Sequence, residues 1–476
     1  MQHDRSGSLP RAWSLVLGTV GAGSLLVQGS AAHGGTPGMD DALVQIAELK
    51  QELAEFKQQE SQGWLTEQRS SEIRGIVQDV LADAETRTGF QDSGMTAGWN
   101  KGFFLASPDG NFKLKLSGQV QVRYVLNHAD GTESAGSEDD SPYLYGMENR
   151  RTKLKFSGHI FNPSWTYEVK GGFSRSGGAF GLEDAWLGKD LGDGFKLKVG
   201  QFKAPWLREE MVSSSRQLTV ERSIVNEYFN QGYSQGLQLS YGTDDYKLAG
   251  WIGDGIGPRG LGDAGFNSMN TPWDATTTNY SFAARGEWKM AGEWSQFKDF
   301  SSRPGSGFGA MMGVSGVMQR AGQNAGVQES GTLASGVTAD LTLDFDGASM
   351  FLSGVWTDIE ASGAAGGATS NPFGVTIQGG YYLCEDVEIF GRYEYMDYDY
   401  ESQPNDDASK FDGFTVGANW FLNSAVKLTV DWTINFASLD TEAPNNAFVS
   451  SSAGFRPDQP GQTDQWALRA QLQLLF

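Results

Sequence analysis

The last eleven residues of the chain, 466–476, alternate between apolar and polar side chains almost without interruption. One set is Trp466, Leu468, Ala470, Leu472, Leu474 and Phe476, and the other is Ala467, Arg469, Gln471 and Gln473, with Leu475 as the exception. A period of two places the two sets on opposite faces of a β-strand. Because a terminal strand frays unless it is held, this pattern indicates lipid on the apolar face and a neighbouring strand along the backbone. The segment predicts the closing strand of a transmembrane β-barrel.

The same alternation recurs through most of the chain after residue 112. Segments such as 112–127 and 426–436 keep it over about ten to fifteen residues, whereas strands usually have about five or six. A soluble β-sandwich also alternates, but this length favours strands that cross a membrane. We expect about 16 antiparallel strands, a number that leaves a water-filled lumen. They are placed at 112–127, 148–160, 164–174, 180–190, 194–203, 234–243, 245–254, 279–290, 308–319, 331–345, 348–358, 373–383, 386–398, 411–421, 425–437 and 464–476.

The expected connections between these strands alternate in length. Tight turns at 162–163, 244–245, 346–347, 384–385 and 423–424 alternate with long loops at 128–147, 204–233, 255–278, 359–372, 399–410 and 438–463. Short turns on one side and long loops on the other are typical of outer-membrane barrels. No apolar stretch of about 18 residues occurs outside the N-terminus, which disfavours a helical membrane protein.

The N-terminal residues 1–32 have the pattern of a secretory signal peptide. Arg5 and Arg11 precede an apolar centre at 13–27, and small residues at 29–32 follow it. The glycines and the flanking residues disfavour the alternative, a buried helix. The single cysteine, Cys384, permits no intramolecular disulfide bond.

Residues 33–90 have a helical rather than a strand periodicity. Heptad spacing relates Met39, Ala42, Ile46, Leu49, Leu53 and Phe56. A single helix of this length is marginal in water, so the apolar stripe needs a partner. Two interpretations remain open, a self-associating coiled coil in the periplasm or an amphipathic helix on the barrel or on another protein. The Gly-rich residues 91–111 are expected to form a linker to the barrel domain, residues 112–476.

The composition excludes several classes of function. A formal charge of −22 opposes binding to nucleic acid. The chain has only four histidines, and they are scattered, so neither a histidine-based triad nor a histidine metal cluster is visible. We therefore expect no enzyme, no metal site and no cofactor.

Loop 204–233 is the expected long segment with the most mixed charge. Its candidate constriction residues, with the residue before it, are Lys203, Arg208, Glu209, Glu210, Arg216, Glu221 and Arg222. The loop follows the fifth expected strand, so it is the third long loop on its side. Folded into the lumen, it would narrow the pore and create a strong local field. The alternative is an exposed loop whose ion pairs contribute little.

A second set of basic residues is expected to face the lumen from the strands. These residues are Lys113, Lys115, Arg123, Arg151, Lys153 and Lys155. Four of the lysines lie on two strands that we expect to be adjacent, so their charges could form one basic wall. The alternative is an ordinary solvated pore lining.

Four segments resemble the phosphate-selective porin O and P family: Arg150 to Gly158, Glu183 to Trp186, Val199 to Pro205, and Ser213 to Ser223. The resemblance implies a trimeric, 16-stranded outer-membrane porin whose third loop folds inward. A heptad segment ahead of the barrel is similar to versions in bacteria with unusual envelopes, and Phe476 resembles the signal that outer-membrane assembly machinery recognises. In the best-known members, anion preference depends on ladders of arginine and lysine, whereas the basic positions here are scattered in an acidic chain.

The sequence therefore supports two functional hypotheses. The first is passive diffusion of small hydrophilic solutes, among them anions such as phosphate, through a pore constricted by loop 204–233. The second is an envelope tether, in which the coiled coil reaches the cell wall and the barrel is a membrane anchor. About 50 helical residues would extend roughly 75 Å. A sugar channel would need a line of lumen aromatics, which the sequence does not reveal.

Overall fold

The computed structural model describes residues 94–129, 141–257, 270–273, 278–321, 331–360, 369–399, 410–438, 453–456 and 463–476. The expected signal peptide, residues 1–32, and the expected coiled coil, residues 33–90, lie outside this part of the chain.

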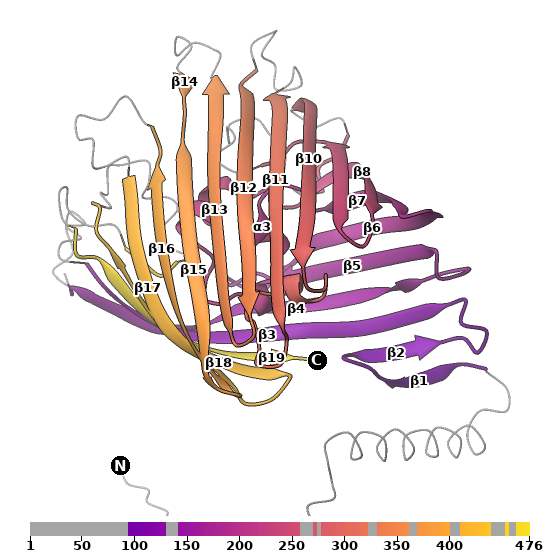
Figure 1. Cartoon of the computed structure of the whole chain (residues 1–476), viewed down its shortest axis with the longest axis horizontal. Coiled ribbons are helices and arrows are strands. Elements are labelled where there is room, and N and C mark those ends of the chain that lie inside the picture. The colour runs from indigo at the N-terminus through magenta and orange to yellow at the C-terminus, as the bar shows by residue number, and fades with distance from the viewer. Residues whose placement is uncertain are drawn as a thin grey trace, which may run out of the picture. The chain divides into compact units, whose positions relative to one another are not determined.

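Sixteen long strands of the described residues form one closed antiparallel barrel (Figure 1). They are β3 (Lys113–His128), β4 (Tyr143–His159), β5 (Trp165–Phe173), β6 (Phe180–Gly192), β7 (Phe195–Phe202), β8 (Ser234–Gly242), β9 (Tyr246–Gly253), β10 (Thr278–Ala291), β11 (Phe308–Ala321), β12 (Leu333–Phe345), β13 (Ala348–Glu360), β15 (Phe373–Cys384), β16 (Val387–Asp397), β17 (Lys410–Phe421), β18 (Val426–Asn435) and β19 (Trp466–Leu475). The short β14 (Thr369–Ser370) adds only to the end of β13. Pairing of β19 with β3 closes the sheet, which confirms the predicted barrel of about 16 strands.

The largest difference in strand boundaries is at the start of β4. The sequence placed this start at residue 148, but the strand begins at Tyr143. Residues 143–147 continue to pair with the end of β3, from Tyr124 to His128. Because the pairing extends to the last residue of β3, the first long loop is shorter than expected.

A small hairpin precedes the barrel, formed by β1 (Thr96–Trp99) and β2 (Phe103–Ala106). It lies inside the segment expected to be a linker, 91–111, and gives part of that segment regular structure. β2 pairs with the first residues of β3, from Lys113 to Leu116, whereas β19 pairs with β3 from Gln119 onward. The hairpin therefore covers the edge of β3 that β19 leaves unpaired.

The closing strand β19 has the faces that its alternation predicts. Leu468, Leu472 and Leu474 are exposed on the outside, and Arg469, Gln471 and Gln473 are buried inside. The final residue is also paired, because Gly118 N donates to Phe476 O at 2.7 Å and Phe476 N donates to Gly118 O at 3.1 Å. The backbone of the last strand is thus satisfied to the end of the chain.

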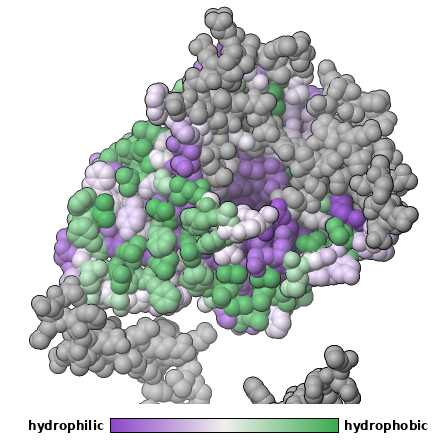
Figure 2. All heavy atoms as spheres, turned by 180° about the vertical axis from the view of Figure 1, so that it is seen from behind, coloured by the Kyte–Doolittle hydropathy of each residue, from purple (hydrophilic) through white to green (hydrophobic). Residues whose placement is uncertain are grey.

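The outside of the barrel is apolar and its inside is polar. Outward-facing side chains such as Phe282, Val314, Val337, Trp356 and Ile377 are exposed to the surroundings. Figure 2 shows this hydrophobic outer surface around a hydrophilic hollow. Among the described residues, no helix has both the length and the hydropathy needed to cross a membrane.

One connection on the short-turn side is long. Residues 292–307 join β10 to β11 and contain the 3₁₀ turn η3 (Gln296–Lys298). Phe297 and Phe300 are buried in the barrel, and Phe300 N donates to the Arg216 carbonyl at 3.4 Å. The connection enters the lumen because these two phenylalanines pack there, a feature that the turn pattern of the sequence did not predict.

Candidate functional site

Loop L3, defined as residues 203–233, connects β7 to β8 and occupies part of the lumen. It contains α3 (Arg208–Met211), η1 (Ser214–Arg216) and α4 (Ile224–Phe229). The Ser223 side chain caps α4 by accepting a hydrogen bond from Asn226 N at 2.9 Å. Because β7 is the fifth barrel strand, L3 is the third loop on its side, as the sequence predicted.

The apolar side of L3 packs against strands β11 to β16. One buried cluster contains Trp206, Ile224, Val225 and Phe229 of the loop with Val317, Ala334, Val355, Ile359 and Met396 of the strands. Gly374 permits this approach, since a Cβ there would lie 2.7 Å from Val225 Cγ1. Burial of each large apolar side chain contributes about 1.5–3 kcal/mol. This packing anchors L3 to one half of the wall.

Polar side chains of β16 to β18 bind the backbone of L3. Lys427 Nζ donates to Gln217 O at 2.9 Å, Asn419 Nδ2 donates to Leu218 O at 2.9 Å, and Val220 N donates to Asp431 Oδ2 at 2.9 Å. These bonds satisfy loop groups that would otherwise be buried without partners. They hold the loop to the same half of the wall as its apolar contacts.

Three arginines surround the Glu221 carboxylate of L3. Its distances are 2.7 Å to Arg123 Nη1, 2.6 Å to Arg150 Nε and 2.7 Å to Arg151 Nη2, and its side chain is 1% exposed. Burial alone would raise the pKa of Glu221, but the three guanidinium groups hold it well below its ordinary value. We call these four residues the Glu221 cluster. It ties L3 to β3 and β4.

Neighbouring residues Arg150 and Arg151 reach the same carboxylate because β4 contains a β-bulge. The register passes from Gln121 opposite Arg151 to Val122 opposite Asn149, which leaves Arg150 without a partner residue. In a regular strand, consecutive side chains point to opposite faces. The bulge therefore turns two successive arginines to the lumen side.

A second bulge has the same effect on β6. Glu183 has no partner residue in the register with β5, and both Glu183 and Asp184 face inward. Glu183 pairs with Lys153 at 2.5 Å, and Asp184 pairs with Lys170. The two bulges thus add charged side chains to the lumen that strict alternation would place outside.

Inside L3, Glu210 bridges two basic residues. Its carboxylate pairs with Lys203 and lies 3.2 Å from Arg222 Nε, and it accepts a hydrogen bond from Asn226 Nδ2 at 2.9 Å. Burial opposes ionisation, but Arg222 and Lys203 lower the pKa of Glu210 to about 2. The group is therefore ionised at neutral pH, where it neutralises part of the loop's basic charge.

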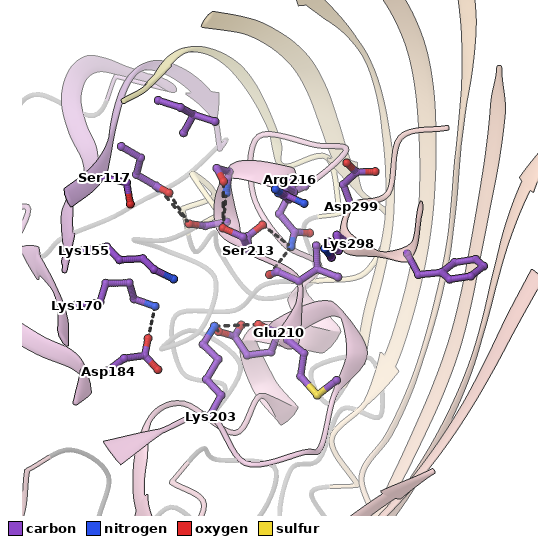
Figure 3. A pocket seen from close by; sticks show the side chains of 18 of the residues that line it. Ser117, Lys155, Lys170, Asp184, Lys203, Glu210, Ser213, Arg216, Lys298 and Asp299 are labelled. Atoms are coloured by element: carbon purple, nitrogen blue, oxygen red, sulfur yellow. Dashed lines mark hydrogen bonds and ion pairs between the residues drawn. The ribbon is translucent and has the colours of Figure 1, made fainter. Parts of the chain in front are cut away.

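A cavity of about 2020 Å³ lies beside L3 and reaches the turn end of the barrel. Sixteen lysine and arginine residues but only six acidic residues line it, although the whole chain has a formal charge of −22. We define the lysine wall as Lys115, Lys153, Lys155, Lys170 and Lys198 of β3, β4, β5 and β7. Figure 3 shows Lys155 and Lys170 on the strand side of the cavity, opposite Lys203 and Arg216 of L3.

Several cations of this lining have no acidic group of the described residues within ion-pair distance. Lys115, Lys198 and Arg216 form no ion pair with a described carboxylate. The Lys198 ammonium lies 4.4 Å from the ring centroid of Trp186 and 4.1 Å from that of Phe202, which positions it by cation–π contact. These three basic groups therefore face the cavity without a direct ion pair.

The residues predicted from the sequence divide into two groups. Eight line the cavity: Lys115, Lys153, Lys155, Lys203, Arg208, Glu210, Arg216 and Arg222. The structure places five others away from its lining: Lys113, Arg123, Arg151, Glu209 and Glu221. Lys113 lies over the Phe104 ring at 5.4 Å, and Glu209 accepts a hydrogen bond from Ser223 N at 2.8 Å inside L3. Of the remaining three, Arg123 and Arg151 pair with Glu221 in the Glu221 cluster.

Sequence reasoning also missed lumen residues. Lys170 and Lys198 lie at alternating inward positions, so the period of their strands could have identified them. Arg150 and Glu183 could not be identified in this way, because each sits in a bulge. Among the described residues, no group of three or more histidine, cysteine, aspartate or glutamate side chains is placed to hold a metal ion.

The comparison that decides the family is a match of residues 120–473 to the phosphate-selective porin O and P family. The chain belongs to this family. It is therefore an outer-membrane porin, a passive channel whose apolar outer surface contacts lipid. In such barrels the short turns face the periplasm and the long loops face the outside.

Two solved structures share the porin's fold. The anion-selective porin from Comamonas acidovorans has a TM-score of 0.51 at 11% identity, covering 76% of this chain and 99% of its own. The outer membrane channel DcaP of Acinetobacter baumannii has a TM-score of 0.50 at 11% identity, covering 80% of this chain and 100% of its own. At these identities the likeness establishes the barrel fold alone. No curated protein matches the chain.

Proposed function

We propose that this porin passes small anions in preference to cations. The observation that carries the proposal is the excess of lysine and arginine over acidic residues in the cavity lining. A cleft with charge of one sign and low-dielectric walls concentrates ions of the opposite sign. Exposed charges more than about 10 Å away are largely screened at 0.1 M salt, so the lining outweighs the acidic remainder of the chain. Phosphate is one member of the expected solute class.

L3 forms the constriction in this proposal. Its apolar side and backbone are held by β11 to β18, and the Glu221 cluster ties it to β3 and β4. The cavity beside the lysine wall remains as the path for solute. Lys203, Arg216 and Arg222 line this cavity from the loop side. Anions would therefore pass between basic side chains on two sides.

Replacement of Arg216 by glutamate tests the constriction. The Arg216 side chain is exposed, so reversal of its charge breaks no buried pair, whereas Arg222→Glu would disrupt the contact with Glu210. We expect the reversal potential of Arg216→Glu channels in a KCl gradient to shift toward cations. Lys189→Glu is the matched control, because Lys189 lies over Trp165 on the outer face at 4.7 Å. An Arg216→Glu channel with the selectivity of the control would contradict the proposal.

We also propose that the porin is a homotrimer. The support is its family, in which the sequence resemblance implies trimeric assembly. In planar bilayers, each insertion of one trimer should then add three equal conductance levels. Insertion in single steps from purified, folded protein would contradict the trimer.

A second role is proposed for the predicted coiled coil, residues 33–90. Its heptad spacing supports a periplasmic segment that binds the cell wall or another envelope component. Deletion of residues 39–87 should leave conductance intact and weaken the envelope. A deletion strain with an intact envelope would contradict tethering without affecting the channel proposal.

We also propose how the porin is exported and assembled. Residues 1–32 would direct export and be removed, and Phe476 would be recognised by outer-membrane assembly machinery. The channel is proposed to act without catalysis or a cofactor, because solute needs only a charged, water-filled path.

A further inference from the structure

We propose that Glu221 is a specificity-determining residue whose carboxylate fills an anion site formed by Arg123, Arg150 and Arg151. In this way it withdraws three guanidinium groups from the passing solute. The inference rests on the proposed passage of anions and adds which basic groups meet them. The lysine wall and the exposed Arg216 contact the solute, whereas Arg123, Arg150 and Arg151 do not.

The geometry of the Glu221 cluster is that of an oxyanion site. Glu221 Oε1 accepts from Arg123 Nη1 at 2.7 Å and from Arg150 Nε at 2.6 Å, and Oε2 accepts from Arg150 Nη2 at 3.1 Å and from Arg151 Nη2 at 2.7 Å. Arg150 thus forms a two-pronged contact. Arginine binds carboxylates and phosphates through the same planar fork, so Glu221 presents the chemistry of an oxyanion solute.

The cluster lies next to the solute path. Arg151 is two residues before Lys153 on the same face of β4, a separation of about 7 Å. Glu221 itself precedes Arg222, and both Lys153 and Arg222 line the cavity, whereas no member of the cluster does. The arginines are therefore close enough to serve the path but are covered by their internal carboxylate.

The loop backbone keeps this carboxylate in place. Glu221 O accepts hydrogen bonds from Arg392 Nη1 at 2.8 Å and from Thr219 Oγ1 at 2.5 Å. The side chains of Glu221, Arg123 and Arg151 are 1%, 2% and 9% exposed, and Arg150 is the most accessible at 13%. A tethered ligand competes at high effective concentration, so a dilute solute does not displace it.

In this arrangement, lysine side chains attract anions to the path, but no arginine site is open to retain them. A lysine ammonium is a strongly hydrated point charge, whereas an arginine fork holds an oxyanion in a fixed bidentate geometry. With the arginines occupied, the path keeps its preference for anions but has no site that retains phosphate. Phosphate should therefore pass without strongly inhibiting the chloride current.

The test is inhibition of chloride conductance by inorganic phosphate in planar bilayers. Glu221→Gln has nearly the same shape but loses the charge, so the phosphate concentration for half-inhibition should fall at least about tenfold. The double variant Glu221→Gln/Arg150→Ala should lose most of this gain. Heat-resistant migration and circular dichroism confirm that each variant is folded. A folded Glu221→Gln channel whose conductance rises without phosphate inhibition would overturn the inference, because the loop would then have moved and left no anion site.

Arg150→Ala alone gives a second test in which Glu221 keeps two arginines. Phosphate inhibition and anion preference should change less than about twofold, since Arg150 does not meet solute. A loss of anion preference as large as that of Lys155→Gln would overturn the inference. Cation preference in the unmodified protein would instead refute the proposed function, so the two failures are distinguishable.

Discussion

The two halves of the barrel wall use basic residues in opposite ways. On strands β10 to β19, Arg285 pairs with Asp340 at 2.8 Å and Arg469 pairs with Asp431 at 2.7 Å, and all four side chains are almost fully buried. On β3 to β7, the lysine wall faces a cavity, and Lys115 and Lys198 form no direct ion pair with a described carboxylate. Arginines of β10 to β19 are thus neutralised in buried pairs, whereas part of the lysine wall faces the cavity without a direct ion pair.

Strand length varies around the wall and does not follow this division, because β3 and β4 have 16 and 17 residues. β5, β7, β8 and β9 have eight or nine residues each, whereas β10 to β13 have 13 or 14. The longer strands offer more inward positions, and part of them packs against L3. The strands that pack against L3 position the loop, and the lysine wall supplies much of the positive charge of the cavity lining.

The largest expected effect comes from loss of the loop's apolar anchor. Trp206 is fully buried, and its Nε1 donates to Phe229 O at 2.9 Å. Trp206→Ala should destabilise the packing of L3 by up to about 5 kcal/mol. Single-channel recordings should then show larger and noisier conductance, since the loop would no longer be held against one half of the wall.

The matched control for this experiment is Trp165→Ala, which removes an exposed tryptophan of the outer face. It should leave single-channel conductance unchanged. Equal conductance changes in the two variants would contradict a specific role of Trp206 in holding L3, because a general loss of barrel stability would then explain both.

The second effect concerns charge in the packed half. Arg285→Ala leaves Asp340 buried and removes the hydrogen bond from Arg285 Nη1 to Ser315 Oγ at 3.0 Å. We expect a loss of about 3 kcal/mol, because an unpaired buried carboxylate is strongly unfavourable. Unfolding by urea in detergent measures this loss.

Lys155→Ala gives the contrast to Arg285→Ala. The Lys155 side chain is 38% exposed and pairs with Glu168 at 2.5 Å, so its removal should change stability by less than about 1 kcal/mol. Similar losses for the two variants would show that the halves do not differ in how they use charge.

The sequence predicted the barrel, its strand number and the position of L3 because each depends on local alternation and loop length. It also placed Lys115, Lys153 and Lys155 on one wall, since they occupy regular inward positions. Bulges hid Arg150 and Glu183, because a bulge is visible only in the pairing register.

For some residues, the prediction that they line the pore was wrong for a different reason. Arg123, Arg151 and Glu221 lie together but away from the cavity lining, which depends on how a folded loop covers the strands. No periodicity encodes that long-range contact. Phe297 and Phe300 were missed because their connection enters the lumen from the short-turn side.

The smallest expected effect is that of pH. Burial raises the pKa of Glu210, but Arg222 and Lys203 outweigh it and lower the value to about 2, against an ordinary value of 4.5. A depressed pKa contributes stability that is complete above about pH 4.5 and is lost as pH falls toward 2. Glu210 should therefore hold L3 equally well from pH 7 to about 4.5, and its contribution to conductance should be constant over this range. A Glu210→Gln variant should lose the response below pH 4.5, and a response of the same size in that variant would assign it to another group.

Whether the lysine wall sets anion preference is tested most directly by the anion-to-cation permeability ratio of a channel with Lys115, Lys155 and Lys198 all replaced by glutamine. These three lysines line the cavity, and none belongs to the buried pairs of β10 to β19. We expect the unmodified porin to prefer anions in a KCl gradient and the triple variant to lose most of this preference while remaining folded. An unmodified porin that prefers cations, or a triple variant with an unchanged ratio, would contradict this expectation.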